Sequence, residues 1–186
     1  DGKYRIARYS DITILLRSMK NWSDIFSEVF MENDIPVDTV SDVGFYSSHE
    51  IKIILSVLAV IDNIYMDVEL AAVLKSYIGR LTDDELARLK IAQRKATDDR
   101  CLYEAAVYYI EHGRDTTLRD KLSKVIGLID GLKNKKVYMS IRAIIWEVLD
   151  KTGYFEYVGS MSSGEKRQAN ILFLIEQADN YENTSY

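Results

Sequence analysis

The sequence has 186 residues, of which 47% are hydrophobic and 28% are charged, and it contains a single proline. A chain of this length and composition can bury roughly 70% of its unfolded surface, so we expect one or two ordered globular domains. The formal net charge of -5 excludes a uniformly basic nucleic-acid coat, although it is compatible with a local basic patch.

Cysteine and histidine usage narrows the class of protein further. Cys101 is the only cysteine, which excludes an intrachain disulfide, and His49 and His112 are too well separated to suggest a Cys/His metal cluster. We therefore assign no metal ligand and expect a reducing, cytoplasmic location. No apolar run reaches the ~18 residues of a membrane span, and the start at residues 1–3 has neither an initiator Met nor a signal-peptide pattern. We expect no membrane association and a fragment of a longer protein.

The N-terminal part of the chain predicts a strand, a helix and a second strand. Residues 11–17, DITILLR, have strand length without the alternation of a half-exposed strand, which predicts a strand buried on both faces of a parallel sheet. Residues 22–30 place apolar side chains at helical spacing, and residues 35–40, IPVDTV, have the composition of a second strand. Together these elements make a βαβ unit.

The stretch Val43–Asn63 predicts a buried helix directly after this unit. Its apolar residues between Ile51 and Ile61 leave little room for a polar face, as in helices that are buried all round. Ser47 and Glu50 have the spacing of a capping box, and Gly44 permits a sharp turn from strand into helix. We expect the rest of the chain to pack around this helix.

Only helices are predicted after Asn63. A Thr82/Glu85 capping box starts one of them, and Trp22 and Trp146 fall in register with apolar neighbours, so we expect both tryptophans in the core. The fold class is α/β turning mainly α, with a short βαβ piece followed by an all-helical subdomain. Helical spacing and capping residues place the later helices at residues 67–76, 82–95, 101–112, 117–132, 140–151 and 164–182.

The search for chemical motifs excludes most catalytic classes. The sequence has no G-x-x-x-x-G-K-[ST] phosphate loop, no G-x-G-x-x-G fingerprint, no H-E-x-x-H zinc motif and no G-x-S-x-G elbow. We therefore assign no catalytic residue to this chain. Composition and pattern alone indicate a helix-rich binding or scaffold segment.

The nearest feature to a phosphate-binding loop lies at residues 162–168, SSGEKRQ, where a Gly-containing loop meets a helix start with two cations in its first turn. Helix N-termini bind phosphate groups, so Gly164, Lys166, Arg167 and Gln168 are candidates for holding a nucleic-acid backbone. The alternative is a capped helix whose cations are solvated or paired with acidic neighbours, which is the commoner situation for surface charges.

Other polar and aromatic residues could likewise either contact nucleic acid or have no role beyond solvation and packing. His49 and Lys52 lie on the first turn of the helix in Val43–Asn63, within reach of a substrate strand, although a polar residue at a helix start is often incidental. Tyr46, Tyr154 and Tyr157 are candidates for stacking against bases, whereas core or rim packing is the commoner role of tyrosine in helical proteins.

A set of short motifs follows one another along the chain in a fixed order. The motifs are Asp11-Ile-Thr-Ile-Leu-Leu-Arg, Ile35-Pro-Val, Gly44-Phe-Tyr-x-x-x-Glu-Ile-Lys, Leu81-Thr-Asp-Asp-Glu-Leu, Thr152-Gly-Tyr and Gly164-Glu-Lys-Arg-Gln-Ala-Asn. In this order the chain resembles the UvrD-like superfamily 1 DNA helicases, most closely the AddA type, the helicase/nuclease A subunit of RecB-like recombination machines. The sequence departs from that pattern at Ile64 and Tyr77, where the family usually has proline.

This resemblance implies a piece of a motor protein. Residues 1–80 would be part of a RecA-like 2A lobe and residues 81–186 the helical 2B insertion. ATP and Mg²⁺ would be cofactors of the parent protein, and its partners would be DNA, at single strands and duplex junctions, and a second helicase/nuclease subunit. Residues near the DNA strand would be Arg17, Phe45, His49 and Lys52, with Gly164, Lys166, Arg167 and Gln168 on the 2B surface.

The function implied by the resemblance is DNA positioning and lobe structure, without ATP hydrolysis, in an ATP-dependent DNA helicase/exonuclease of double-strand break repair and recombination. The alternative is a helical protein-interaction module that shares the packing pattern and has no enzymatic role. The two hypotheses differ in a simple observable, since the first expects weak, salt-sensitive DNA binding by the isolated segment.

Overall fold

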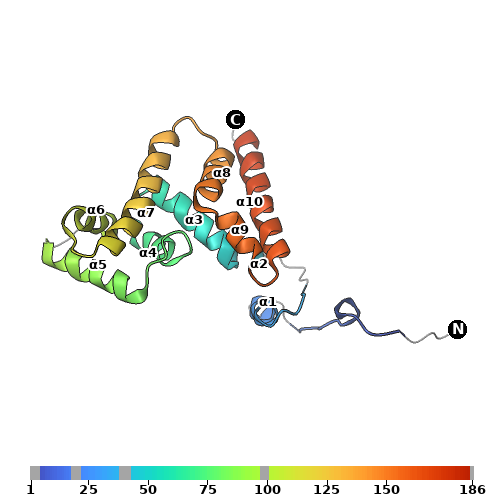
Figure 1. The fold of residues 1–186 in the computed structure, drawn as a ribbon. Coiled ribbons are helices and arrows are strands. Elements are labelled where there is room, and N and C mark those ends of the chain that lie inside the picture. The colour runs from blue at the N-terminus through green and yellow to red at the C-terminus, as the bar shows by residue number, and fades with distance from the viewer. Residues whose placement is uncertain (1–4, 18–21, 38–42, 97–100, 185–186) are drawn as a thin grey trace.

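A computed structural model describes residues 5–17, 22–37, 43–96 and 101–184, and within these ranges the regular structure is helical (Figure 1). A short 3-10 turn, η1 (Tyr9–Asp11), precedes the α-helices. These are α1 (Trp22–Glu32), α2 (Val43–Ser47), α3 (His49–Asp62), α4 (Asp67–Lys75), α5 (Asp83–Ala96), α6 (Leu102–His112), α7 (Thr116–Lys135), α8 (Ile141–Thr152), α9 (Tyr154–Gly159) and α10 (Gly164–Thr184).

The helices predicted after Asn63 are confirmed, and most of their ends agree within one or two residues. Their boundaries carry the expected signals: the Ser140 side chain accepts a hydrogen bond from the backbone N–H of Ala143, and Gly153 ends α8 in the left-handed conformation at φ 63°. Helix α9 was not predicted, because it is shorter than two turns and follows Gly153 without a loop.

The predicted βαβ unit is wrong, since no β-strand occurs among the described residues. Residues 12–16 form no regular structure and residue 17 lies in a bend, and Ile12 and Leu15 are 66% and 90% exposed. A strand needs a neighbour to pair its backbone groups, and the second predicted strand makes no ladder at residues 35–37, while its residues 38–40 lie outside the described residues. The helix predicted between the two strands is confirmed as α1.

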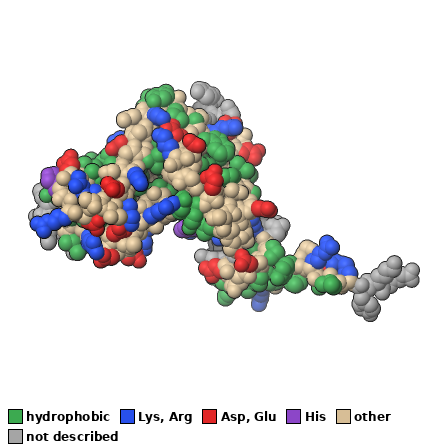
Figure 2. All heavy atoms as spheres, in the orientation of Figure 1, with side chains coloured by type: hydrophobic (Ala, Val, Ile, Leu, Met, Phe, Trp, Pro, Cys, Tyr) green, Lys and Arg blue, Asp and Glu red, His purple; other side chains and the backbone are tan. Residues whose placement is uncertain are grey.

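The expectation that both tryptophans lie in the core is also wrong. Trp22 is 58% exposed and Trp146 is 41% exposed, with their rings tilted against Phe26 and Phe155 at centroid distances of 6.3 Å in each case. Helical spacing identifies the apolar side of a helix, but it does not say whether another element covers that side. The N-terminal arm, residues 5–17, exposes most of its hydrophobic side chains. Figure 2 shows both hydrophobic side chains and charges of both signs on the surface of the helical body.

Helix α3 is the central helix, as predicted, because it contributes to both hydrophobic cores. Its first half, including Ile51 and Ile54, lies in a core with α8, α9 and α10, which we call the α10 core. Its second half, including Val57 and Val60, lies in a core with α4 to α8, which we call the α7 core. None of the described helices combines the length and hydropathy needed to cross a bilayer.

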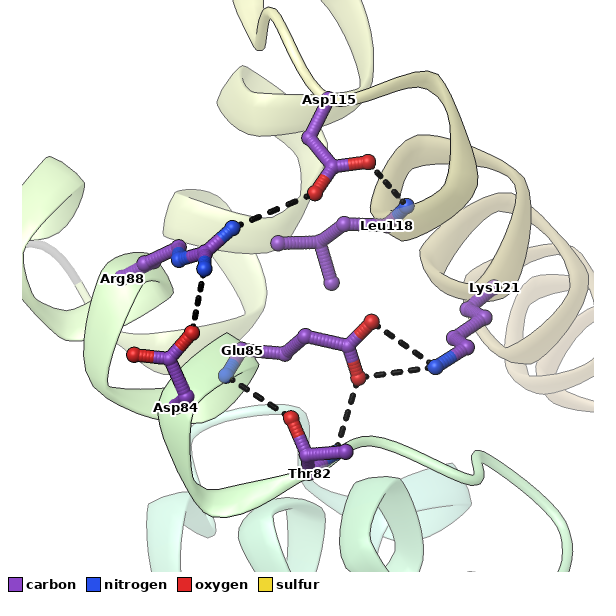
Figure 3. A network of polar contacts seen from close by, with 7 residues as sticks. All are labelled: Thr82, Asp84, Glu85, Arg88, Asp115, Leu118 and Lys121. Carbon is purple, nitrogen blue, oxygen red and sulfur yellow. Dashed lines mark hydrogen bonds and ion pairs between the residues drawn. The ribbon is translucent and has the colours of Figure 1, made fainter.

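The Thr82/Glu85 capping box is confirmed at the start of α5 (Figure 3). The backbone N–H of Thr82 donates to Glu85 Oε2 at 2.8 Å, and the N–H of Glu85 donates to Thr82 Oγ1 at 3.2 Å. The same carboxylate accepts from Lys121 Nζ of α7 at 2.8 Å, so the box also joins α5 to α7. These hydrogen bonds, led by the one from Lys121, hold the pKa of Glu85 below its usual value of 4.5.

This lowered pKa predicts a pH-dependent contribution to stability. Because the folded-state pKa lies below the unfolded-state value, the ion pair stabilises the fold above that value, and its contribution is lost as pH falls through the folded-state pKa. We expect Glu85→Gln to lower the free energy of unfolding by roughly 1–2 kcal/mol at pH 7, and by much less at pH 3. Urea unfolding at both pH values measures this.

The exposed Glu176 on α10 supplies the control, since Glu176→Gln is expected to change stability little at either pH. An equal loss for Glu85→Gln at pH 7 and pH 3 would contradict an electrostatic role and leave only the capping geometry.

Candidate functional site

The first turns of α3 and α10 meet around a buried carboxylate. Glu50 is 2% exposed, and its Oε2 accepts from Arg167 Nη1 at 2.7 Å while its Oε1 accepts from Asn170 Nδ2 at 2.7 Å. Arg167 Nε also donates to the carbonyl oxygen of Ser162 at 3.0 Å. A charge is stable in the interior only when it is paired and hydrogen-bonded, and both conditions hold here. We call Glu50, Arg167 and Asn170 the Glu50 clasp.

This arrangement corrects the predicted Ser47/Glu50 capping box. The N-cap of α3 is Ser48, preceded by the short helix α2, and its side chain donates to the carbonyl oxygen of Phe45 at 2.6 Å without capping α3. Glu50 turns its carboxylate to α10 instead. The local spacing fitted a cap, but a partner more than a hundred residues away satisfies the carboxylate better because it brings an opposite charge.

The glycine and the polar side chains at the start of α10 serve the fold. Gly164 is buried, and a Cβ at this position would lie 2.0 Å from the carbonyl oxygen of Gly159. Lys166 Nζ donates to the carbonyl oxygen of Val37 at 2.6 Å, and Gln168 Nε2 donates to that of Phe155 at 3.1 Å. The side-chain donors of Lys166, Arg167 and Gln168 in the predicted phosphate loop are therefore directed at protein acceptors. A hollow of about 400 Å³ adjoins it, lined by Pro36, Val37, Ser163, Gly164, Glu165 and Lys166.

The predicted site residues near α3 are more accessible than those at the start of α10. His49 and Lys52 are exposed on its first turn, and neither makes an ion pair within the described residues. Phe45 is half-buried on α2, with its ring 4.9 Å from that of Tyr46 and 5.0 Å from that of Phe173. Phe45, His49 and Lys52 thus lie within eight residues across α2 and the first turn of α3, whereas Arg17 is exposed in the segment that precedes α1.

The three tyrosines that were candidates for base stacking lie in different environments. Tyr154 is buried in the α10 core, where burial and, second, the charge of Glu50 raise the pKa of its phenol well above the usual range. Tyr157 stacks face to face on Tyr77 at 3.9 Å. Only Tyr46 of the three keeps a largely accessible ring, at 55% exposure.

Sequence reasoning missed the roles of Glu50 and Asn170. Two signals pointed to them: Glu50 is an acidic residue at the start of an otherwise apolar helix, and Asn170 lies three residues after Arg167, on the same side of α10. Neither signal identifies the partner, because the contact joins positions 117 and 120 residues apart.

Comparison with known proteins gives consistent matches over the whole chain. Residues 3–186 match the family model of the UvrD-like helicase C-terminal domain. The chain is 40% identical over 185 residues to the A subunit of the ATP-dependent helicase/nuclease of Ruminiclostridium cellulolyticum, and 36% identical over 185 residues to the protein of that name in Acetivibrio thermocellus. Each match covers 100% of this chain but 14% of the relative, so the chain spans about one seventh of their length.

Proposed function

Because the chain belongs to the UvrD-like helicase C-terminal domain family, we propose that it is a segment of the A subunit of an AddA-type ATP-dependent helicase/nuclease. In this proposal it supports the motor lobe and positions DNA during double-strand break repair and recombination. One observation supports the proposed role in lobe structure. Two sequence motifs far apart in the chain, one with Glu50 and one with Arg167 and Asn170, form the buried Glu50 clasp.

The division of the segment follows from the same proposal. Residues 1–80 belong to the second motor lobe, 2A, and residues 81–186 to the 2B insertion. Helix α3 then belongs to the 2A part, and its burial in both the α10 core and the α7 core, to which residues of the 2B part contribute, supports a rigid connection. ATP and Mg²⁺ act in the parent protein, outside this segment, and a second helicase/nuclease subunit is the partner. No residue of this chain is assigned to ATP hydrolysis.

The DNA-facing role is assigned to the first turn of α3. His49 and Lys52 are exposed there beside Phe45, while Arg167 and Gln168 are engaged in internal hydrogen bonds. A side chain that contacts a phosphate must be accessible and must not already neutralise a buried acid. Arg17 remains part of the proposed DNA-facing set, and Gly164, Lys166, Arg167 and Gln168 act in it by fixing the start of α10 against α3, α9 and the segment at Val37.

Lys52→Ala tests the DNA-facing role. Loss of one phosphate contact is expected to weaken binding of a labelled fork DNA about fivefold near 0.1 M salt, and to reduce the slope of log affinity against log salt by about 1. Fluorescence anisotropy at several salt concentrations gives both values.

Lys124→Ala is the matched control, because Lys124 is an exposed lysine on α7. Equal affinities and equal salt slopes for the two variants would remove the first turn of α3 from the DNA-facing surface. If neither the wild type nor the variants bound DNA, the helical protein-interaction module would be the better hypothesis.

A further inference from the structure

A three-layer stack joins the turn between α4 and α5 to α9. The ring of Tyr77, in the turn, lies face to face with the ring of Tyr157 on α9, with the centroids 3.9 Å apart and the planes at 9°. The guanidinium carbon of Arg80 lies 4.0 Å from the centroid of the Tyr77 ring. Two groups this close cannot share one face of a ring, so Tyr77 lies between the other two. We call Arg80, Tyr77 and Tyr157 the tyrosine stack.

The turn that carries the stack has a strained backbone. Arg80 has a φ of 54°, in the left-handed region that residues with a Cβ rarely adopt. Its N–H donates to the carbonyl oxygen of Ser76 at 2.7 Å, and its Nε donates to that of Tyr77 at 3.1 Å. The N–H of Leu81 then donates to the carbonyl oxygen of Leu74 at 2.9 Å and closes the turn. Strain of this kind persists only where the surrounding contacts impose it, so the turn can relax when those contacts are lost.

The stack also connects the two hydrophobic cores. Leu74 and Leu81, which precede and follow Tyr77 in the sequence, are buried in the α7 core. Tyr77 and Tyr157 instead pack against the α10 core. The turn is therefore anchored at both ends in one core, while its aromatic ring lies against the other, and the contact between Tyr77 and Tyr157 is what holds it there.

We propose that the tyrosine stack is a conformational latch for the turn at residues 76–81. While the stack is closed, the turn lies against α9; when the ring of Tyr77 leaves that of Tyr157, the turn opens and Arg80 relaxes to a negative φ. Arg80 is exposed and both tyrosines are only half-buried, so the stack opens without unfolding either core. The strain released at Arg80 offsets part of the stacking that is lost, which makes the open form a minor state of the folded protein. The latch goes beyond the proposed function, because it involves no DNA.

Hydrogen exchange of the backbone N–H groups of Arg80 and Leu81 measures the opening, because both are hydrogen-bonded across the turn only while it is closed. In the full 186-residue chain, Tyr157→Ala is expected to raise both exchange rates about tenfold, the size expected for loss of one stacked aromatic pair. Tyr157→Phe keeps the ring and is expected to exchange like the wild type. Arg80→Ala removes only the exposed cation and is expected to raise the exchange rate of Leu81 about threefold.

Two controls separate local opening from a general loss of stability. The N–H of Ile129, in the middle of α7, reports unfolding of the α7 core, and its exchange is expected to accelerate less than that of the turn. His112→Ala breaks the stack between Tyr108 and His112 within α6, whose centroids are 4.4 Å apart, and should leave the exchange of the turn unchanged.

Tyr77→Pro distinguishes a latch from simple packing. Ser76 has φ -68° and ψ 177°, the extended conformation that a residue before proline adopts, and the N–H of Tyr77 has no hydrogen-bond partner among the described residues. Proline therefore fits at position 77 and fixes the turn without the ring. In the Tyr77→Pro background, Tyr157→Ala is expected to change the exchange rate of Leu81 less than twofold.

Three results would overturn the latch. The first is equal exchange of Arg80 and Leu81 in the wild type and in Tyr157→Ala. The second is an acceleration at Ile129 as large as that in the turn, since the loss would then be global. The third is a tenfold effect of Tyr157→Ala in the Tyr77→Pro background, since Tyr157 would then act by packing and not through the stack. If Tyr157→Ala does not fold, Arg80→Ala decides, and an unchanged rate at Leu81 overturns the latch.

Discussion

Arg167→Ala is expected to lower the free energy of unfolding by about 3–5 kcal/mol, a large effect for one side chain at the start of a helix. The side chains of Arg167 and its partner Glu50 are 16% and 3% exposed, so truncation of Arg167 leaves a buried carboxylate that still accepts a hydrogen bond from Asn170. Such an uncompensated charge costs more than the contact that was removed. Urea unfolding followed by circular dichroism measures the loss.

Two control variants test whether the unpaired buried charge causes the loss of stability in Arg167→Ala. Arg142→Ala breaks the ion pair between Arg142 and Asp179, whose side chains are 52% and 45% exposed, and should cost at most about 1 kcal/mol. The double variant Glu50→Gln/Arg167→Met removes both charges and should recover much of the loss, because no buried charge is left unpaired. If Arg167→Ala and Arg142→Ala cost the same, the Glu50 clasp is not the joint between α3 and α10.

Gly164→Ala is expected to destabilise the chain by about 3 kcal/mol. A Cβ on this residue would lie 2.0 Å from the carbonyl oxygen and 2.6 Å from the carbonyl carbon of Gly159. Both are backbone atoms, so the clash cannot be relieved by a change of rotamer and must move α9 away from α10. Chemical denaturation of the variant and the wild type gives the difference in stability.

The matched control is Gly131→Ala, in the interior of α7, where a Cβ would meet nothing within 4 Å. Alanine is preferred to glycine inside a helix by about 1 kcal/mol, so this variant should be more stable than the wild type. The same substitution thus has opposite signs at the two positions. A stabilised Gly164→Ala would show that α9 and α10 do not approach as closely as the structure places them.

Local signals in the sequence were sufficient for the helical part of the fold. The Thr82/Glu85 box predicted from the sequence acts within a few residues, as do the Ser140 cap and Gly153 in the structure, so such helix ends can be located without knowledge of tertiary partners. The strand predicted at residues 11–17 could not be judged from local signals, because an apolar run becomes a strand only when it pairs with another strand. The described residues contain no such partner.

The candidate site shows the same limit. Sequence reasoning identified the start of α10 as unusual, and it is, but the unusual residues serve packing: Gly164 permits the approach of α9, and Arg167 neutralises Glu50. A glycine followed by basic residues looks the same in a sequence whether the basic side chains face solvent or pair with a buried acid. The sequence placed His49 and Lys52 on the exposed side of the first turn of α3, and both are exposed in the structure.

Helices α3 and α8 each bury side chains in both cores, α3 through Ile54 and Val57 and α8 through Ile145 and Val148. Opening the α10 core therefore exposes helices whose other sides pack in the α7 core, so the free energy of opening one core includes part of the packing of the other. We therefore expect the stabilities of the two cores to be coupled, so that a perturbation of the α10 core also lowers the stability of the α7 core. In the proposed role, the helical body then responds to load as a single cooperative unit.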